Sequence, residues 1–278
     1  MERKSRWARL LNNPLRRIYG LAVSKLIFRL IPRVHFVKAR LVFDKQMTVS
    51  LPDGLDIYLC GCKSHDSEIR FAKWMIRNLG ESEIFFDVGA HFGFFSLLAS
   101  TIVKTNGKVF SFEPSDFASN ILLKNISGFS NVKSFPLVVS DKSGEEFFSE
   151  RDAGNTEASG IVSENENGKK IKSVSLDEFC MQEKIFPTTI KIDAEGSELK
   201  VLSGMKSLLI NHRPKIIMEF WSKNFHENSQ HFESISFLKS LEYKLNLIDD
   251  SGNLFISDDA EHFCRLRNLE SDNIVFTR

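Results

Sequence analysis

Five acidic side chains in this 278-residue sequence each follow a short apolar run, at the point where a strand is predicted to end. They are Asp87, Glu113, Asp141, Asp193 and Glu219. In an open α/β sheet the carboxyl ends of parallel strands meet at one edge, and ligands bind at that edge. Carboxylates there can accept hydrogen bonds from hydroxyl groups, take up a proton or hold a cation. The spacing therefore predicts an acidic ligand-binding rim.

The segment Asp87-Val88-Gly89-Ala90-His91-Phe92-Gly93 lies between an apolar strand and an apolar, helix-like run. This order is typical of a buried parallel strand, a tight loop and a helix start. A glycine leaves room for a ligand against the backbone, and a helix N-terminus offers free N–H groups to its polar end. We predict a cofactor-binding loop, and its candidate residues are Asp87, Gly89, Ala90, His91 and Gly93.

The loop spacing separates two kinds of cofactor. A dinucleotide site has the pattern G-x-G-x-x-G around a pyrophosphate, whereas this loop reads Asp-x-Gly-x-x-x-Gly. An acid directly before the loop would repel a pyrophosphate and suits the cationic end of S-adenosylmethionine. A structural turn that binds no ligand is the alternative.

Two further acids are candidates for the nucleoside part of the cofactor. Glu113 follows Gly89 by 24 residues, close to the roughly 20 residues at which an acid reaches ribose hydroxyls in βαβ sites. Asp141 ends a third predicted strand, over 132–139, and either accepts a hydrogen bond from an adenine amino group or forms an ordinary turn.

The segment Ile190-Lys191-Ile192-Asp193-Ala194-Glu195-Gly196 predicts a fourth strand and a helix beginning near Ser197. Asp193, Glu195 and Glu219 are our candidate catalytic residues. A carboxylate among neighbouring carboxylates can act as a general base, or the group can share a divalent cation such as magnesium. Asp193 is the first choice for base or ligand. In the alternative, Glu195 and Glu198 only cap the following helix.

Four segments together resemble the FkbM family of S-adenosylmethionine-dependent methyltransferases, over roughly residues 55–220. They are Asp-Val-Gly-Ala, Phe-Glu-Pro, Val-Ser-Asp and, most specifically, Lys-Ile-Asp-Ala-Glu-Gly-Ser-Glu-Leu. The resemblance implies an α/β fold with the class I methyltransferase Rossmann-like sheet, mostly parallel with an antiparallel last strand and helices on both faces. It also implies O-methylation of a hydroxyl on a sugar, glycolipid or other secondary metabolite. His91 stands where the family usually has Asn.

The N-terminal region differs from the rest in charge, since the first 40 residues hold eleven Lys or Arg and one acid, Glu2. Apolar residues recur there at helical spacing, with a start at Asn13-Pro14 and a stop at Pro32. We predict a basic amphipathic helical extension over 1–33, a hairpin and helix over 34–80, and the cofactor-binding domain over 81–278. Residues 1–33 either lie peripherally on an anionic membrane or pack on protein.

Composition narrows the partners and the location. A net charge of +1 argues against a nucleic-acid partner. The resemblance implies a small-molecule or glycan acceptor. Four cysteines without metal-ligand spacing predict reduced thiols and a cytoplasmic protein, with the inner face of the membrane as the peripheral site. A nicotinamide-dependent oxidoreductase and a non-catalytic, membrane-associated cofactor-binding protein are the rival functions. The sequence predicts no oligomeric state.

Periodicity predicts the remaining elements. A hairpin is expected over 36–59, with its turn at Pro52-Asp53-Gly54, and a helix over 65–79. Further expected elements are strands near 146–149, 171–174, 243–248 and 273–277 and a helix over 232–241.

Overall fold

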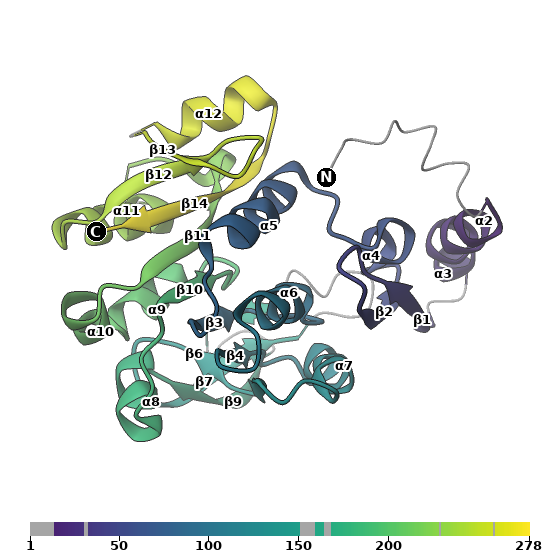
Figure 1. The fold of residues 1–278 in the computed structure, drawn as a ribbon, viewed down its shortest axis with the longest axis horizontal. Coiled ribbons are helices and arrows are strands. Elements are labelled where there is room, and N and C mark those ends of the chain that lie inside the picture. Colours follow the sequence, from purple (N-terminus) through teal and green to yellow (C-terminus); the bar gives the residue numbers. More distant parts are fainter. Residues whose placement is uncertain (1–13, 31–32, 151–158, 164–167, 228, 258) are drawn as a thin grey trace. The chain divides into compact units, whose positions relative to one another are not determined.

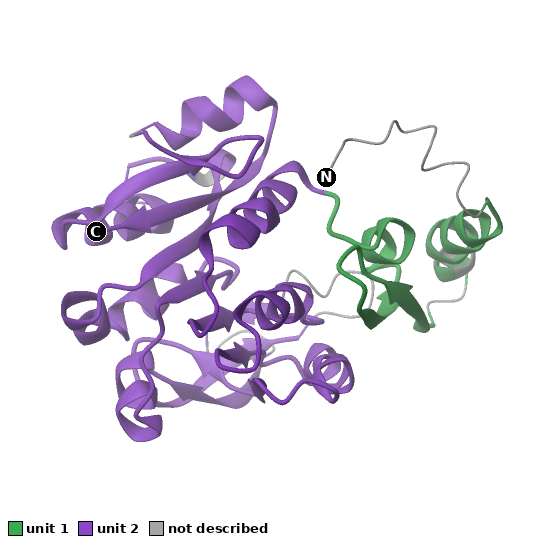
Figure 2. Ribbon diagram, viewed as in Figure 1, with its two compact units in different colours: residues 1–64, 151–158 green, residues 65–150, 159–278 purple. Residues whose placement is uncertain are grey.

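The computed structural model describes residues 14–30, 33–150, 159–163, 168–227, 229–257 and 259–278. The chain divides into two compact units (Figure 2). One comprises Met1–Ser64 with Arg151–Ala158, and the other comprises His65–Glu150 with Ser159–Arg278. We call them the N-terminal unit and the sheet unit. The boundaries predicted at 33/34 and 80/81 stay predictions.

The sheet unit is built on eight strands in the order β13-β12-β14-β11-β10-β3-β4-β5 (Figure 1). Pairing is parallel from β11 through β10, β3 and β4 to β5, while β14 is antiparallel to both neighbours. The predicted mostly parallel sheet with an antiparallel last strand is therefore confirmed. The strand bounds are β3 Ile84–Val88, β4 Lys108–Phe112, β5 Val132–Phe135, β10 Thr189–Ile192, β11 Lys215–Trp221, β12 Lys244–Ile248, β13 Leu254–Ile256 and β14 Ser271–Thr277.

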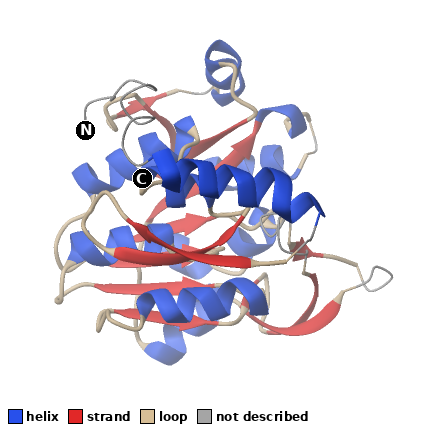
Figure 3. Cartoon of the chain, turned by 90° about the vertical axis from the view of Figure 1, so that its right-hand side faces the viewer, coloured by secondary structure: helices blue, strands red, loops and turns tan. Residues whose placement is uncertain are grey.

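Helices cover both faces of this sheet (Figure 3), and the alternation of side chains along β3 shows how. Asp87 accepts a hydrogen bond from Ser96 of helix α6 on one face. Its neighbour Phe86 packs edge-on against Phe179 of helix α8 on the other face. The helices of the unit are α5 Asp66–Asn78, α6 Phe94–Val103, α7 Asp116–Ile126, α8 Leu176–Glu183, α9 Glu198–Ser203, α10 Lys206–Asn211, η3 Ser222–Asn224, α11 Gln230–Ser240 and α12 Ala260–Arg267.

A smaller sheet has the order β6-β9-β7-β8, with β6 Val138–Val139, β7 Gly144–Ser149, β8 Gly160–Ile161 and β9 Lys169–Val174. The single strand predicted over 132–139 is wrong, because β5 ends at Phe135 and β6 joins this second sheet. Pro136 separates the two strands, since it has no N–H to donate to a ladder. Asp141 therefore follows a strand of the small sheet.

The N-terminal unit contains a hairpin of β1 (His35–Arg40) and β2 (Gln46–Leu51) and a helix α4 (Leu55–Cys60). The predicted turn at 52–54 is wrong, because the hairpin turns earlier, through Asp44 at φ 60°. Apolar residues over 55–59 fit a helical turn as well as a strand, and Gly54 packs against Val49 where the helix starts. Residues 14–30 form α2 (Pro14–Ala22), the π-helical η1 (Val23–Ile27) and α3 (Phe28–Leu30).

The other local predictions hold where the structure describes them. The helices expected at 65–79 and 232–241 are α5 and α11, and the expected strands near 146–149, 171–174, 243–248 and 273–277 are β7, β9, β12 and β14. The helical pattern before Pro14 and the stop at Pro32 lie outside the described residues. Among the described helices, none combines the length and apolar character needed to cross a bilayer.

Candidate functional site

The glycine loop joins β3 to α6, and its backbone is fixed to both neighbouring strands. The N–H groups of Gly89 and Ala90 donate to the carbonyl oxygen of Phe112 at 3.0 and 3.1 Å. Gly89 has a φ of +75°, and an added Cβ would lie 1.9 Å from the carbonyl oxygen of Asp193. A side chain at position 89 would therefore clash with the backbone at the end of β10. This packing requires a glycine there, in addition to the room for a ligand that the sequence predicts.

The second glycine of the loop admits helix α6. Gly93 has a φ of +90°, and an added Cβ would lie 2.5 Å from Cδ1 of Leu122 on α7. It is the N-cap of α6 and supplies no side-chain acceptor for the first turn. That end of the helix thus keeps the partial positive charge expected of a helix N-terminus. His91, at φ 50°, stacks its ring on Phe92.

Glu113 lies against this loop, as its spacing predicts. Its Oε2 accepts the His91 N–H at 2.7 Å, and its Oε1 accepts the Ser115 N–H at 2.9 Å. Burial raises the pKa of Glu113 to about 7, although both backbone hydrogen bonds oppose the shift. Each carboxylate oxygen retains a lone pair that can accept a further hydrogen bond, so the group suits a donor such as a ribose hydroxyl.

Asp87 lies beneath the loop and is fully buried. Its Oδ2 accepts a 2.6 Å hydrogen bond from Ser96 Oγ, which also lies 2.8 Å from Ser111 Oγ. Its Oδ1 lies 3.7 Å from Lys191 Nζ and has no hydrogen-bond partner among the described residues. Burial raises the pKa of Asp87, and the nearby ammonium partly offsets the effect. Its predicted contact with the cationic end of a cofactor stays a prediction.

Lys191 is the residue of this site to which the sequence analysis assigned no role. It is buried in β10, and its Nζ lies 2.9 Å from Asp193 Oδ2 and 3.5 Å from the Gly89 carbonyl oxygen. Burial lowers the pKa of Lys191, but the carboxylates of Asp193 and Asp87 outweigh it, so the pKa is raised. The sequence did contain a signal for this role. Lys191 lies inside a short apolar strand and two residues before Asp193, and side chains at that spacing point to the same face of a sheet.

The three predicted catalytic carboxylates come together at the ends of β10 and β11. One oxygen each of Asp193, Glu195 and Glu219 lies within 4.8 Å of the other two. Glu219 accepts a 3.0 Å hydrogen bond from Trp221 Nε1. Burial, followed by the charge of Asp193, raises the pKa of Glu219 to about 8. Neighbouring carboxylates with unequal surroundings are the arrangement expected of a proton-accepting or cation-binding group.

Glu198 holds the turn before α9, and Glu195 belongs to the carboxylate group. Oε1 of Glu198 accepts the N–H groups of Ala194 and Gly196 at 3.2 and 3.1 Å, which holds the turn before α9. Glu195 adopts a φ of 48° in that turn, a conformation uncommon for a residue with a side chain. Glu198 thus fixes the backbone that presents Glu195.

Asp141 stands apart from these contacts. It is exposed after β6, and its described hydrogen bond is from Ser140 Oγ at 3.1 Å. An added Cβ on Gly204, which follows α9, would lie 3.0 Å from its Cα. The structure therefore packs Asp141 beside the end of α9, and its predicted contact with adenine stays a prediction.

Comparison with protein families gives one match that covers more than half of the chain. The model of a family described as "Methyltransferase FkbM domain" matches residues 87–245, a range that contains every predicted site residue. No curated protein matches the sequence.

Solved structures give a likeness in fold. A methyltransferase FkbM from Methylobacillus flagellatus KT is 16% identical, with a TM-score of 0.50 over 81% of this chain and 52% of that one. The chain thus spans about half the length of that protein. Aeropyrum pernix fibrillarin with natively bound S-adenosyl-L-methionine is 10% identical, with a TM-score of 0.46 over 88% of this chain and 100% of that one. A SAM-dependent O-methyltransferase from Thermotoga maritima is 13% identical, with a TM-score of 0.43 over 87% and 77%.

Proposed function

Since the chain belongs to the FkbM methyltransferase family, we propose that it transfers a methyl group from S-adenosylmethionine to a hydroxyl of a sugar, glycolipid or other secondary metabolite. One observation carries this proposal. The carboxylate group of Asp193, Glu195 and Glu219 lies at the ends of β10 and β11, and β10 is paired with β3, which carries the glycine loop. A cofactor at the loop and an acceptor at the carboxylates would thus be neighbours.

The residues present fit the nucleoside and amino-acid parts of such a cofactor. Glu113 offers two carboxylate oxygens to ribose hydroxyls, and the N-terminus of α6 offers partial positive charge to a carboxylate. Bound S-adenosylmethionine would supply the electrophilic methyl carbon. The loop backbone, held by Phe112 and Asp193, would keep that cofactor in a fixed orientation.

The acceptor hydroxyl is a poor nucleophile at neutral pH, so a positioned base increases its reactivity. We assign this role to Asp193, which Lys191 holds in place by a 2.9 Å ion pair. Glu195 and Glu219 would orient the hydroxyl. Carboxylate oxygens are also the ligands that Mg²⁺ prefers, and a cation at this group would acidify the hydroxyl. Loss of turnover in EDTA with recovery in Mg²⁺ would distinguish the cation from a base acting alone.

Cofactor choice is the first test. Purified protein is titrated by calorimetry with S-adenosylhomocysteine and, separately, with NAD. We expect binding of S-adenosylhomocysteine alone, because the loop lacks the third glycine of a pyrophosphate site. Binding of NAD alone would overturn the proposal in favour of a nicotinamide-dependent oxidoreductase.

Catalysis is tested with Asp193→Asn and labelled S-adenosylmethionine against a panel of glycans and glycolipids. The variant should retain affinity for S-adenosylhomocysteine and lose about 10²–10⁴-fold in turnover. Asp44→Asn, an exposed aspartate of the N-terminal unit, is the matched control. If no panel member is methylated by the wild type, or if Asp193→Asn keeps full turnover, the assigned acceptor class or base is wrong.

A further inference from the structure

The N-terminal unit presents an apolar stripe on helix α2. Leu15, Ile18 and Tyr19 are 81%, 65% and 47% exposed, and their spacing places them on one side of the helix. Gly20 is buried and faces α4, where an added Cβ would lie 3.1 Å from the Tyr58 ring and 3.2 Å from Leu55. The helix therefore packs on α4 through Gly20 and through the Tyr19 ring, which lies edge-on to Tyr58 with the ring centroids 6.5 Å apart. Leu15 and Ile18 are the most exposed apolar residues of the stripe.

The chain segment that holds this stripe is basic. No acidic residue occurs between Glu2 and Asp44, and over 14–43 the chain carries seven Lys or Arg. Of these, Lys25, Arg33, Lys38 and Arg40 are exposed in the structure, and Arg40 forms an ion pair with Asp44. Exposed apolar side chains beside exposed basic ones suit an anionic bilayer, whose acyl chains take the apolar groups and whose phosphate headgroups take the basic groups.

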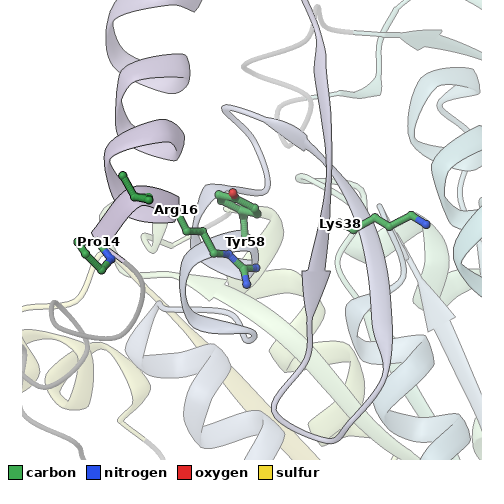
Figure 4. Close-up of a pocket in the computed structure, with 5 residues that line it drawn as sticks. Pro14, Arg16, Lys38 and Tyr58 are labelled. Carbon is green, nitrogen blue, oxygen red and sulfur yellow. The ribbon is translucent and has the colours of Figure 1, made fainter.

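A surface pocket of about 450 Å³ adjoins the stripe and is lined by Pro14, Leu15, Arg16, Lys38 and Tyr58 (Figure 4). The guanidinium of Arg16 lies 4.3 Å from the centre of the Tyr58 ring, and the two side chains point toward each other. Nε of Arg16 is buried and has no hydrogen-bond partner among the described residues. Arg16 lines the pocket, so a phosphate oxygen that enters it would meet a guanidinium, a charge-assisted donor.

Leu15 links the two features, because it belongs to the stripe and also lines the pocket. We propose that this face of the N-terminal unit docks on an anionic membrane surface. Leu15, Ile18 and Tyr19 enter the boundary between headgroups and acyl chains, while Arg16 binds a lipid phosphate. The proposal is independent of the methyltransferase assignment, which rests on the sheet unit.

The test is cosedimentation of the full chain with vesicles of phosphatidylcholine alone, or of phosphatidylcholine and phosphatidylglycerol in equal parts. We expect binding to the anionic vesicles that weakens as salt is raised, because the headgroup contribution is screened. The double variant Leu15→Ser/Ile18→Ser should bind at least about tenfold more weakly, since two apolar side chains no longer leave water. Arg16→Gln should also weaken binding and flatten its salt dependence.

Leu266→Ser is the matched control, because Leu266 is 72% exposed but lies in the sheet unit. It should bind vesicles like the wild type. Unchanged circular dichroism and S-adenosylhomocysteine affinity would show that each variant is folded. Equal binding by wild type and Leu15→Ser/Ile18→Ser would overturn the proposal, as would equal binding to neutral and anionic vesicles.

Two other occupants would give different results. Inorganic phosphate that abolishes vesicle binding in competition, at constant ionic strength, would show that the pocket takes free phosphate and would overturn docking through the stripe. A dimer in size-exclusion chromatography that becomes a monomer in Leu15→Ser/Ile18→Ser, without any vesicle binding, would assign the stripe to a second copy of the chain.

Discussion

Lys191 lies between the glycine loop and the carboxylate group. Its ammonium is 2.9 Å from Asp193 and 3.7 Å from Asp87, and it is nearly excluded from water. A buried carboxylate is unfavourable unless a positive charge lies near it, and Lys191 supplies that charge to both Asp193 and Asp87. The residue thereby couples the backbone under the cofactor to the proposed base.

Removal of the Lys191 ammonium should therefore destabilise the fold. Lys191→Met is expected to lower the free energy of unfolding by about 3 kcal/mol, because it leaves Asp87 buried without a compensating charge. Urea unfolding measures the change, and Lys200→Met, an exposed lysine, is the control, expected within about 0.5 kcal/mol. The double variant Lys191→Met/Asp87→Asn should recover part of the loss. A single variant as stable as the control would contradict the role of Lys191.

Glu113 predicts how cofactor affinity depends on pH. Ribose hydroxyls donate to the ionised carboxylate, whereas at a pKa of about 7 the ligand-free protein carries a proton there in mild acid. Affinity for S-adenosylhomocysteine should thus fall by up to tenfold per pH unit below about pH 7 and level off above about pH 8. Calorimetry across this range measures it, with Glu113→Gln expected to bind weakly without the pH slope. A wild-type affinity independent of pH would exclude Glu113 as the acceptor.

The same carboxyl affects stability with the opposite sign. Its pKa rises from 4.5 to about 7 on folding, so the folded protein holds the proton more tightly than the unfolded chain. The contribution to stability is fully present below about pH 4.5 and is lost as the pH rises through about 7. In the ligand-free protein, mild acid therefore favours the fold while it weakens the cofactor site.

At the scale of elements, a buried ion pair attaches helix α5 to the far half of the sheet. Both Nη2 contacts of Arg70 to the Asp272 carboxylate on β14 measure 3.0 Å, and Nη1 donates to the carbonyl oxygen of Ile248 on β12 at 2.8 Å. Helix α5 directly precedes β3, the strand that carries the glycine loop. This contact therefore fixes the position of the segment from which β3 begins. Burial raises the pKa of Asp272, and Arg70 opposes the shift.

Breaking this pair should destabilise the whole sheet unit. Arg70→Met is expected to reduce the free energy of unfolding by about 3–5 kcal/mol, because Asp272 would stay buried without its partner. Arg265→Met, which removes an exposed pair with Glu261, should cost less than about 1 kcal/mol. Arg70→Met/Asp272→Leu should be more stable than Arg70→Met. Equal effects of Arg70→Met and Arg265→Met in urea unfolding would refute a structural role for the buried pair.

At the scale of the molecule, the two proposed functions lie in different units. Every predicted cofactor-binding and catalytic residue lies in the sheet unit, and the proposed membrane face lies in the N-terminal unit. Cytoplasmic location and the acceptor class stay predictions.

This division makes a prediction about a truncated chain. A protein lacking residues 1–64 should bind S-adenosylhomocysteine within about threefold of the full chain, a difference of less than about 1 kcal/mol. The same protein should lose affinity for anionic vesicles. Calorimetry and cosedimentation measure the two properties separately, with the full chain as control. A folded truncated protein that fails to bind the cofactor would show that the N-terminal unit contributes to the cofactor site.

Local pattern in the sequence predicted most strands and helices of the sheet unit and the acids at the ends of three of its strands. Apolar runs ending in Asp87, Glu113 and Asp193 are short-range signals, because a buried parallel strand and a glycine turn are specified by adjacent residues. The grouping of Asp193, Glu195 and Glu219 followed from the rule that parallel strands share one carboxyl edge. The sequence alone could therefore predict the fold class and the meeting of these three carboxylates, whose catalytic role stays a prediction.

Tertiary structure decided what depends on residues far apart in the chain. The backbone of Asp193 requires a glycine at position 89. Lys191 and Asp87 lie close together on the neighbouring strands β10 and β3. Asp141 follows a strand of the small sheet. Only packing brings these groups within a few ångströms, and it also removes the water that would otherwise screen them. Burial and the electrostatics that follow from it, such as the raised pKa of Glu113, belong to the fold because no run of neighbouring residues encodes them.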